Sequence, residues 1–115
     1  HRYSSAASDV YKRQSLISGK IEFNESTNTI ADGLRTNLGS INFPIIQNYV
    51  KEILLVSEDE IMDSLDIIIN KLKIVVEPSS AVVLAALIKN NKKFKNKNIG
   101  LIMCGGNIDF NSLKF

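Results

Sequence analysis

The sequence predicts an α/β fold in which an open, mostly parallel sheet is flanked by helices. Segments with helical and strand-like patterns alternate along the chain, in the order helix, strand, helix, short strand, helix, strand. The last of these segments, Ile99 to Met103, contains only apolar residues and glycine, as expected of a strand buried on both faces of a parallel sheet. The 115 residues suit one small domain or a piece of a larger one.

The composition argues against several functional classes. A formal net charge of +2 is too small for a dedicated nucleic-acid binder. No run approaches the roughly 18 apolar residues of a membrane span, and the first residues lack the apolar core of a secretory signal. The single cysteine excludes an internal disulfide and fits a reducing compartment. We therefore expect a cytoplasmic protein without nucleic-acid or membrane partners.

Residues 1–14 differ from everything that follows them. They contain clusters of serine and alanine, no apolar period and no initiating methionine, and they carry the whole net charge of the chain. We interpret them as a non-native leader, such as a cloning or assembly scar, with a disordered native terminus as the alternative. The domain is therefore expected to run from residue 15 to residue 115.

Residues 15–39 predict connecting segments around one compact turn. The alternating residues from Lys20 to Phe23 indicate a short edge strand or an extended connector, and the polar run 24–28 indicates a loop. Ala31, Asp32 and Gly33 then form a turn signal. Asp32 either caps a short helix or presents its carboxylate to a cleft, and the capping interpretation is favoured.

The middle of the chain carries the clearest helix signal. Asn42 to Val50 predicts a short helix with a proline in its first turn, and Glu52 to Val56 predicts a strand. Ser57 and the acidic residues after it form a capping box, with negative charge where the helix dipole favours it. Apolar residues then recur every three or four positions, which predicts an amphipathic helix as far as about Lys71.

The last third predicts a buried helix between two strands. Ile74 to Val76 is a brief β-branched run, and Pro78 suits the first position of the helix that follows. Ala81 to Ile88 is apolar on nearly every side, so this helix should be buried within a larger body. The lysine-rich stretch Lys89 to Lys97 is expected to be a solvated loop, and residues 107–115 begin another element.

The exit from the last predicted strand is a candidate ligand contact. Cys104, Gly105, Gly106 and Asn107 follow that strand, and adjacent glycines allow positive φ or a close approach of the backbone. Ligands of open α/β sheets bind at the carboxyl ends of the strands. An ordinary turn is the competing interpretation of this segment taken alone.

Three motifs taken together identify a family. TIADGLRT begins at Thr29, VVEPSSA at Val75 and MCGGNID at Met103. With these motifs, residues 15 to about 110 resemble the carboxy-terminal part of the catalytic domain of fold-type II pyridoxal-phosphate enzymes, which has the tryptophan-synthase-β-like fold. Within that group the chain looks most similar to the threonine ammonia-lyase (threonine dehydratase) and serine racemase family. The resemblance implies a partial catalytic domain over residues 15–115 and pyridoxal 5'-phosphate as the cofactor of a full-length parent enzyme.

The resemblance also implies roles for individual residues. Cys104 stands where the family usually has the serine that hydrogen-bonds the pyridine nitrogen, and a thiol is the weaker partner. The backbone of Gly33 passes beside the cofactor ring, and the Glu77 carboxylate lies close to it. The residues assigned to the cofactor are Gly33, Glu77, Cys104, Gly105, Gly106 and Asn107. Those assigned to the substrate side are Asp32 and Thr36.

The family chemistry fits these residue types. A neutral thiol or hydroxyl at the ring nitrogen leaves the pyridine largely unprotonated, so the ring is a mild electron sink. This suits loss of a β-hydroxyl after deprotonation at Cα. The expected reaction converts L-threonine or L-serine to a 2-oxo acid and ammonia, within amino-acid metabolism. A second acid–base group on the opposite face would allow racemisation.

The sequence lacks two parts that the family needs. It contains neither the Ser-Phe-Lys type motif with the Schiff-base lysine nor the Gly-rich phosphate loop. We therefore assign no catalytic residue and no metal ligand, and we expect the chain to be inactive alone. The parent enzyme is expected to act on a small amino acid and to be a homo-oligomer.

Two alternatives to a dehydratase remain open. The first is a serine racemase of the same fold. The second is a non-catalytic α/β module for ligand binding or subunit interaction, which would explain the missing lysine. The apolar helix Ala81 to Ile88 speaks against this module, because a complete small domain would give that helix a polar face.

Overall fold

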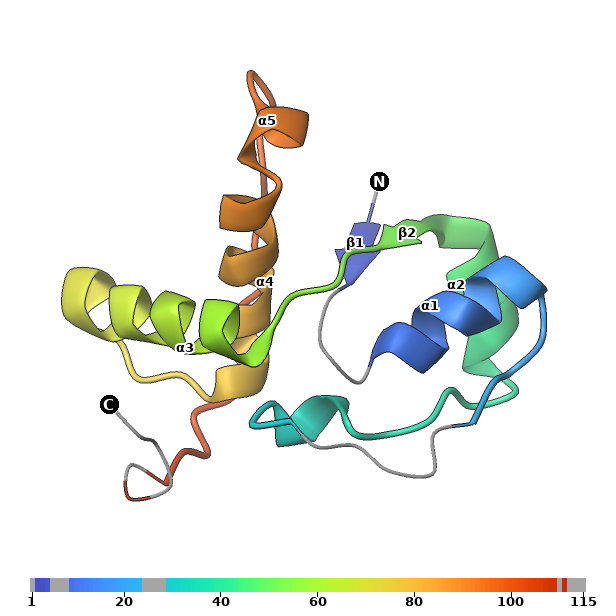
Figure 1. The fold of residues 1–115 in the computed structure, drawn as a ribbon, viewed down its shortest axis with the longest axis horizontal. Helices are drawn as coiled ribbons and strands as arrows, with labels where there is room; N and C mark the ends of the chain where they lie inside the picture. The colour runs from blue at the N-terminus through green and yellow to red at the C-terminus, as the bar shows by residue number, and fades with distance from the viewer. Residues whose placement is uncertain (1, 5–8, 24–28, 110, 112–115) are drawn as a thin grey trace.

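The computed structural model describes residues 2–4, 9–23, 29–109 and 111 (Figure 1). Its helices and strands follow one another in the order β1 (Arg2–Ser4), α1 (Asp9–Ser18), η1 (Asp32–Leu34), α2 (Asn42–Tyr49), β2 (Val50–Ile53), α3 (Glu58–Ile67), η2 (Ile68–Leu72), α4 (Pro78–Lys89) and α5 (Asn91–Phe94). Here η1 is a 3₁₀ turn and η2 is a π-helical continuation of α3.

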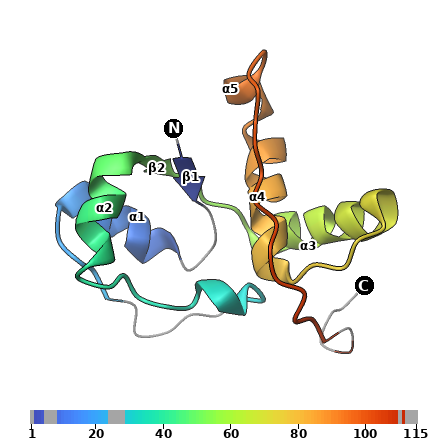
Figure 2. The same ribbon diagram turned by 180° about the vertical axis from the view of Figure 1, so that it is seen from behind.

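The elements form two groups, joined by the extended residues between β2 and α3. Figures 1 and 2 show α1, α2, β1 and β2 together in one group and α3, α4 and α5 in the other. The strands β1 and β2 pair in parallel, with Ser4 opposite Ile53. They are the sheet of the described residues, and the segment around η1 packs against α4 from below.

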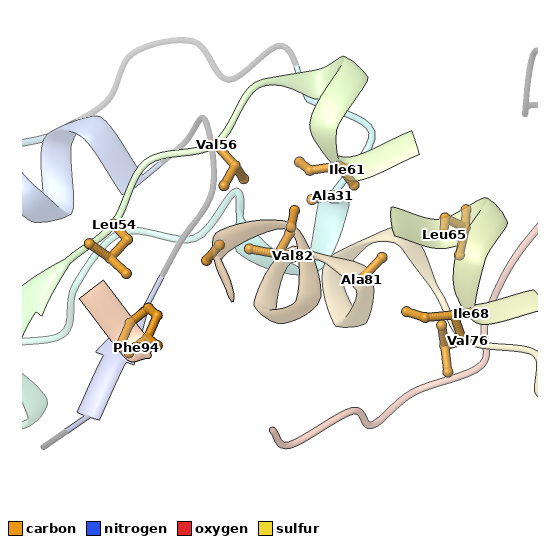
Figure 3. Packing of buried hydrophobic residues seen from close by; sticks show 12 residues of the cluster. Ala31, Leu54, Val56, Ile61, Leu65, Ile68, Val76, Ala81, Val82 and Phe94 are labelled. Atoms are coloured by element: carbon orange, nitrogen blue, oxygen red, sulfur yellow. The ribbon is translucent and has the colours of Figure 1, made fainter. Parts of the chain in front are cut away.

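The core lies between α3 and α4. Ile61, Leu65 and Ile68 recur at a helical spacing, and each is fully buried. The facing side of α4 carries small or β-branched residues, which let the two helices approach closely (Figure 3). These core residues of α4 are Ala81, Val82, Ala85 and Ala86.

The structure confirms the predicted start of α3. The Ser57 hydroxyl accepts a hydrogen bond from the Glu60 amide at 3.2 Å, and the Glu60 carboxylate accepts one from the Ser57 amide at 2.7 Å. The Lys89 ammonium lies 2.9 Å from the same carboxylate and so links the end of α4 to the start of α3. Burial raises the pKa of Glu60, but the hydrogen bonds from Lys89 and Ser57 and the charge of Lys89 outweigh it, so the net pKa lies below its usual value.

The strand predictions are corrected by the structure. Ile99 to Met103 is extended but joins no sheet within the described residues, and the Ile102 side chain is 81% exposed. Ile74 to Val76 is likewise extended and unpaired in the described part of the chain, and the third predicted strand is β2, shifted to Val50–Ile53. A strand needs a hydrogen-bonded neighbour, and among the described residues β1 supplies one only to β2.

Two helix predictions are confirmed, and the outer face of one of these helices is exposed in this chain. Helix α2 matches the predicted Asn42 to Val50, and α4 begins with Pro78 in its first turn as expected. The outer face of α4 is not covered by the described residues, since Ile88 is 45% exposed, and the expectation that a larger body buries this helix stays a prediction. Within the described residues, α3 covers only one face of α4, as Figures 1 and 2 show.

The structure corrects two local predictions, one for the lysine-rich stretch and one for Asp32. The lysine-rich stretch 89–97 contains α5, because the Phe94 ring is buried against the core beside Leu54 (Figure 3). Asp32 does not cap a helix: Ala31 is the N-cap of η1, it makes no side-chain capping bond, and Asp32 is the first residue of the turn. The burial of Phe94 depends on a contact with residues distant in the sequence, so the pattern of neighbouring residues could not predict it.

Helix α1 runs across the boundary that we placed between residues 14 and 15. That residues 1–14 are a non-native leader stays a prediction. The predicted loop 24–28 lies outside the described residues, as do residue 110 and residues 112–115 of the predicted last element. No helix in the described part of the chain is long and apolar enough to cross a membrane.

Candidate functional site

The three motifs meet at the amino-terminal end of α4. Glu77 is the N-cap residue of this helix, and the proline that follows fits the first turn, where its missing amide is no loss. The Glu77 amide donates a hydrogen bond to the Gly105 carbonyl at 3.2 Å. The helix start and the Gly-Gly turn are therefore joined directly through the backbone.

The Glu77 side chain lies against two glycines from different segments. A Cβ atom on Gly105 would lie 2.5 Å from the carboxyl carbon of Glu77, and one on Gly33 would lie 3.5 Å from its Oε1. Gly105 also has a φ of +87°, which side chains disfavour. Glycine is required at position 105 for both reasons, and the carboxylate sits beside bare backbone.

The TIADGLRT segment is held by hydrogen bonds between its own ends and by bonds from α3 and α1. The Arg35 guanidinium donates back to the Thr29 carbonyl through Nε at 3.2 Å, and the Ile30 amide donates to the Glu58 carboxylate at 2.8 Å. The Lys12 ammonium donates to the Leu34 carbonyl at 3.1 Å. These bonds hold η1 with Gly33 directed toward the start of α4, where Ser79 lies.

Two serines that we did not assign to the site lie within it. The Ser79 hydroxyl accepts a hydrogen bond from the Gly33 amide at 3.1 Å. The Ser80 hydroxyl donates to the Cys104 carbonyl. Both follow Glu77 and Pro78 in VVEPSSA, and paired hydroxyls in the first turn of a helix were the available signal.

The structure brings together some of the predicted site residues and not others. Gly33, Glu77, Cys104 and Gly105 are joined by the contacts above. Asp32 is exposed beside Gly33, and a Cβ on Gly106 would make an ordinary 3.6 Å contact with the Val75 carbonyl. Thr36 and Asn107 are exposed and take no part in the hydrogen bonds that join the cluster. Their assigned roles stay predictions.

The cluster fits a flat heteroaromatic cofactor. Glycine at positions 33 and 105 leaves room for the Ser79 hydroxyl and the Glu77 carboxylate directly against the backbone, so polar groups gather at the start of α4. The Cys104 thiol is free and exposed, so a ring nitrogen can reach it. Among the described residues, no group of three or more metal-binding side chains is placed to hold a metal ion.

The Glu77 carboxylate, Gly33 and the Gly105–Gly106 turn thus meet at the start of α4. A family model described as pyridoxal-phosphate dependent enzyme matches residues 5–105, and the chain belongs to this family. Members of the family use pyridoxal phosphate as their cofactor.

Named relatives agree with this assignment. The chain is 44% identical over 111 residues to serine racemase of Dictyostelium discoideum, covering 93% of the chain and 34% of that protein. It is 40% identical over 107 residues to beta-hydroxyaspartate dehydratase of Paracoccus denitrificans, covering 93% of the chain and 33% of that protein. The chain thus spans about a third of the length of the curated relatives it matches.

Solved structures give the same fold. The threonine deaminase of T.th. superposes with a TM-score of 0.88 at 33% identity, covering 94% of this chain and 40% of that one. The Dictyostelium discoideum serine racemase structure has a TM-score of 0.82 at 40% identity, covering 94% and 35%. The predicted fold class, part of an α/β fold-type II domain, is therefore confirmed. The family match begins inside the 1–14 segment, at residue 5.

Proposed function

We propose that the chain is part of a pyridoxal-phosphate enzyme that acts on a β-hydroxy amino acid, as an ammonia-lyase converting L-threonine or L-serine to a 2-oxo acid and ammonia. The observation that carries the proposal is the Glu77 carboxylate lying against Gly33 and Gly105, beside the Cys104 turn. Several of the similar proteins are named for serine, threonine or hydroxyaspartate, which are amino acids with a hydroxyl on Cβ. This shared chemistry supports a β-hydroxy substrate.

Each assigned residue has a physical role in the proposal. The cofactor would supply the electron sink for deprotonation at Cα. The Cys104 thiol pairs weakly with the ring nitrogen and leaves it without a proton. Gly33 and the turn from Gly105 through Gly106 to Asn107 let the backbone approach the ring. The Glu77 carboxylate orients the ring from the end of α4. Asp32 and Thr36 face the substrate.

Serine racemase is the second candidate, and it is as well supported as the lyase. Serine racemases are among the similar sequences and among the similar structures. Elimination and racemisation both begin with removal of the Cα proton, so the residues of this cluster suit either. The position of a second acid–base group decides between them, and none is assigned in this chain.

The remaining parts of the proposal concern the parent enzyme. It would supply the Schiff-base lysine and the phosphate loop, for which this chain has no matching motif. We therefore propose that the chain alone is inactive, and that the parent is a cytoplasmic homo-oligomer without nucleic-acid or membrane partners. A non-catalytic α/β module is the contrasting possibility.

The test uses the protein encoded by the complete reading frame that contains this chain. We expect bound pyridoxal phosphate and release of a 2-oxo acid and ammonia from L-serine or L-threonine, with D-serine measured in parallel to distinguish a racemase. The matched variants are Cys104→Ser, which restores the usual family residue, and Cys104→Ala, which removes the ring partner. Absence of both cofactor and product would contradict the proposal and favour the binding module. Ammonia release by the 115-residue chain with added cofactor would contradict its proposed inactivity.

A further inference from the structure

Two adjacent hydroxyls on α4 bind two loops that are distant in the sequence. Ser79 is bonded to Gly33, 46 residues away, and Ser80 is bonded to Cys104, 24 residues away. Consecutive helical residues point about 100° apart, so neighbouring side chains can serve two different segments. We call this pair, Ser79 and Ser80, the serine clamp.

The two bonds have opposite polarity. The Ser79 oxygen accepts from the Gly33 amide at 3.1 Å, whereas the Ser80 hydroxyl donates to the Cys104 carbonyl. Serine can do both, because a hydroxyl carries one donor and two acceptor lone pairs. Ser80 is 4% exposed and its bond to the Cys104 carbonyl is half-buried, so the loss of this hydroxyl would remove the donor of a partly shielded carbonyl.

Neither loop is held in this place by regular secondary structure. Gly33 belongs to the three-residue turn η1, and residues 101–109 are irregular. The amide of Glu77 adds a third bond from the same helix end, to the Gly105 carbonyl at 3.2 Å. The first turn of α4 is therefore the common reference to which both loops are attached.

We propose that Ser79 and Ser80 are positioning residues that fix Gly33 and Cys104 relative to Glu77, and so set the width of the cofactor site. The catalytic meaning of the clamp rests on the proposed function, whereas its effect on the two loops does not. Alanine at position 79 leaves the Gly33 amide without its acceptor, and alanine at position 80 leaves the Cys104 carbonyl without its donor.

The first experiment measures amide hydrogen exchange in the 115-residue chain by NMR. Ser79→Ala should speed exchange of the Gly33 amide about three- to tenfold, and Ser80→Ala should do the same for the Glu77 amide, because one hydrogen bond is lost locally. The Ile61 amide, bonded to the Ser57 carbonyl at 3.1 Å, is the reference and should not change. Ser79→Thr and Ser80→Thr keep a hydroxyl and should restore slow exchange.

The matched control is Ser64→Ala, which removes a serine hydroxyl at a position 2% exposed on α3. Ser64→Ala should change the exchange rates of the Gly33, Glu77 and Ile61 amides by one common factor. If Ser79→Ala and Ser80→Ala also change all three amides equally, or change none, the clamp is wrong. If an alanine variant does not fold, the same comparison is made on the peptides of the full-length parent by mass spectrometry.

The second experiment uses the full-length parent with pyridoxal phosphate. Ser80→Ala should weaken cofactor binding about threefold or more and shift the absorbance band of the bound cofactor, because one half-buried hydrogen bond at the site is lost. Ser80→Thr should reverse both effects. An unchanged band and affinity would overturn the positioning role. If the parent binds no pyridoxal phosphate while the amides respond as expected, the proposed function fails and the effect of the clamp on the loops stands.

Discussion

Replacing Gly105 with alanine would place a methyl group where the Glu77 carboxylate lies. Two separate penalties are expected. The φ of +87° puts an L-residue in the left-handed region, at a cost of about 1–2 kcal/mol. The new Cβ would also lie 2.5 Å from the Glu77 carboxyl carbon, so the carboxylate must move by about 1 Å to reach ordinary contact, at a further cost of about 1 kcal/mol.

Two other glycines separate these penalties. Gly19 has a φ of +73° and open space around it, so Gly19→Ala should cost only the backbone term of about 1–2 kcal/mol. Gly100 has open space and no positive φ, so Gly100→Ala should change the free energy of unfolding by less than about 0.5 kcal/mol. Gly105→Ala should therefore be the most destabilising of the three, by about 2–3 kcal/mol in total.

The assay is urea unfolding followed by far-ultraviolet circular dichroism. With a slope of about 1–2 kcal/mol/M for a small protein, a loss of about 2–3 kcal/mol in Gly105→Ala should lower the urea midpoint by about 1–3 M. Adding Glu77→Ala to Gly105→Ala should recover about 1 kcal/mol relative to additivity, because the carboxylate is no longer in the way. A Gly105→Ala variant no less stable than Gly19→Ala, or additivity in the double variant, would refute the placement of Glu77.

Three further predictions follow from the fold. Ser57→Ala removes half of the capping box and should lower the free energy of unfolding by about 1 kcal/mol in the same urea assay. Phe94→Ala should cost about 3 kcal/mol because that ring is 9% exposed, whereas Phe23→Ala, at 68% exposure, should be nearly neutral; equal effects would contradict the docking of α5. Since the pKa of Glu60 is lowered in the folded state, its contribution to stability is present above the usual 4.5 and is lost as the pH falls through the folded value. Urea titrations at pH values between about 6 and 3 should show this loss of unfolding free energy. In Lys89→Met the loss should be smaller than in the unsubstituted chain, because one partner of Glu60 is absent. The difference should be only a few tenths of a kcal/mol, because water screens this exposed pair.

Local sequence signals were sufficient wherever a few neighbouring residues decide the conformation. Ser57 and Glu60 satisfy each other's backbone amides, so the start of α3 could be predicted from four residues. Pro78 likewise indicated the first turn of α4. The Gly-Gly pair allowed a positive φ or a close approach of the backbone, and Gly105 has both. The three motifs also identified the family, although each alone was weak.

The sheet and the site depended on contacts between distant segments. Ile99 to Met103 has the composition of a buried strand but no partner among the described residues, because pairing is a property of two segments and not of one. Phe94 lies in a lysine-rich stretch and is buried only because residues near β2 provide a surface for it.

Ser79 and Ser80 show most clearly which features neighbouring residues decide and which ones distant contacts decide. The sequence alone placed two hydroxyls in the first turn of a helix, where they could have capped it or faced solvent. Only the tertiary structure brings Gly33 and Cys104 within reach of them. Local backbone preferences are set by adjacent residues, whereas the partners of a polar side chain are set by how the whole chain folds back on itself.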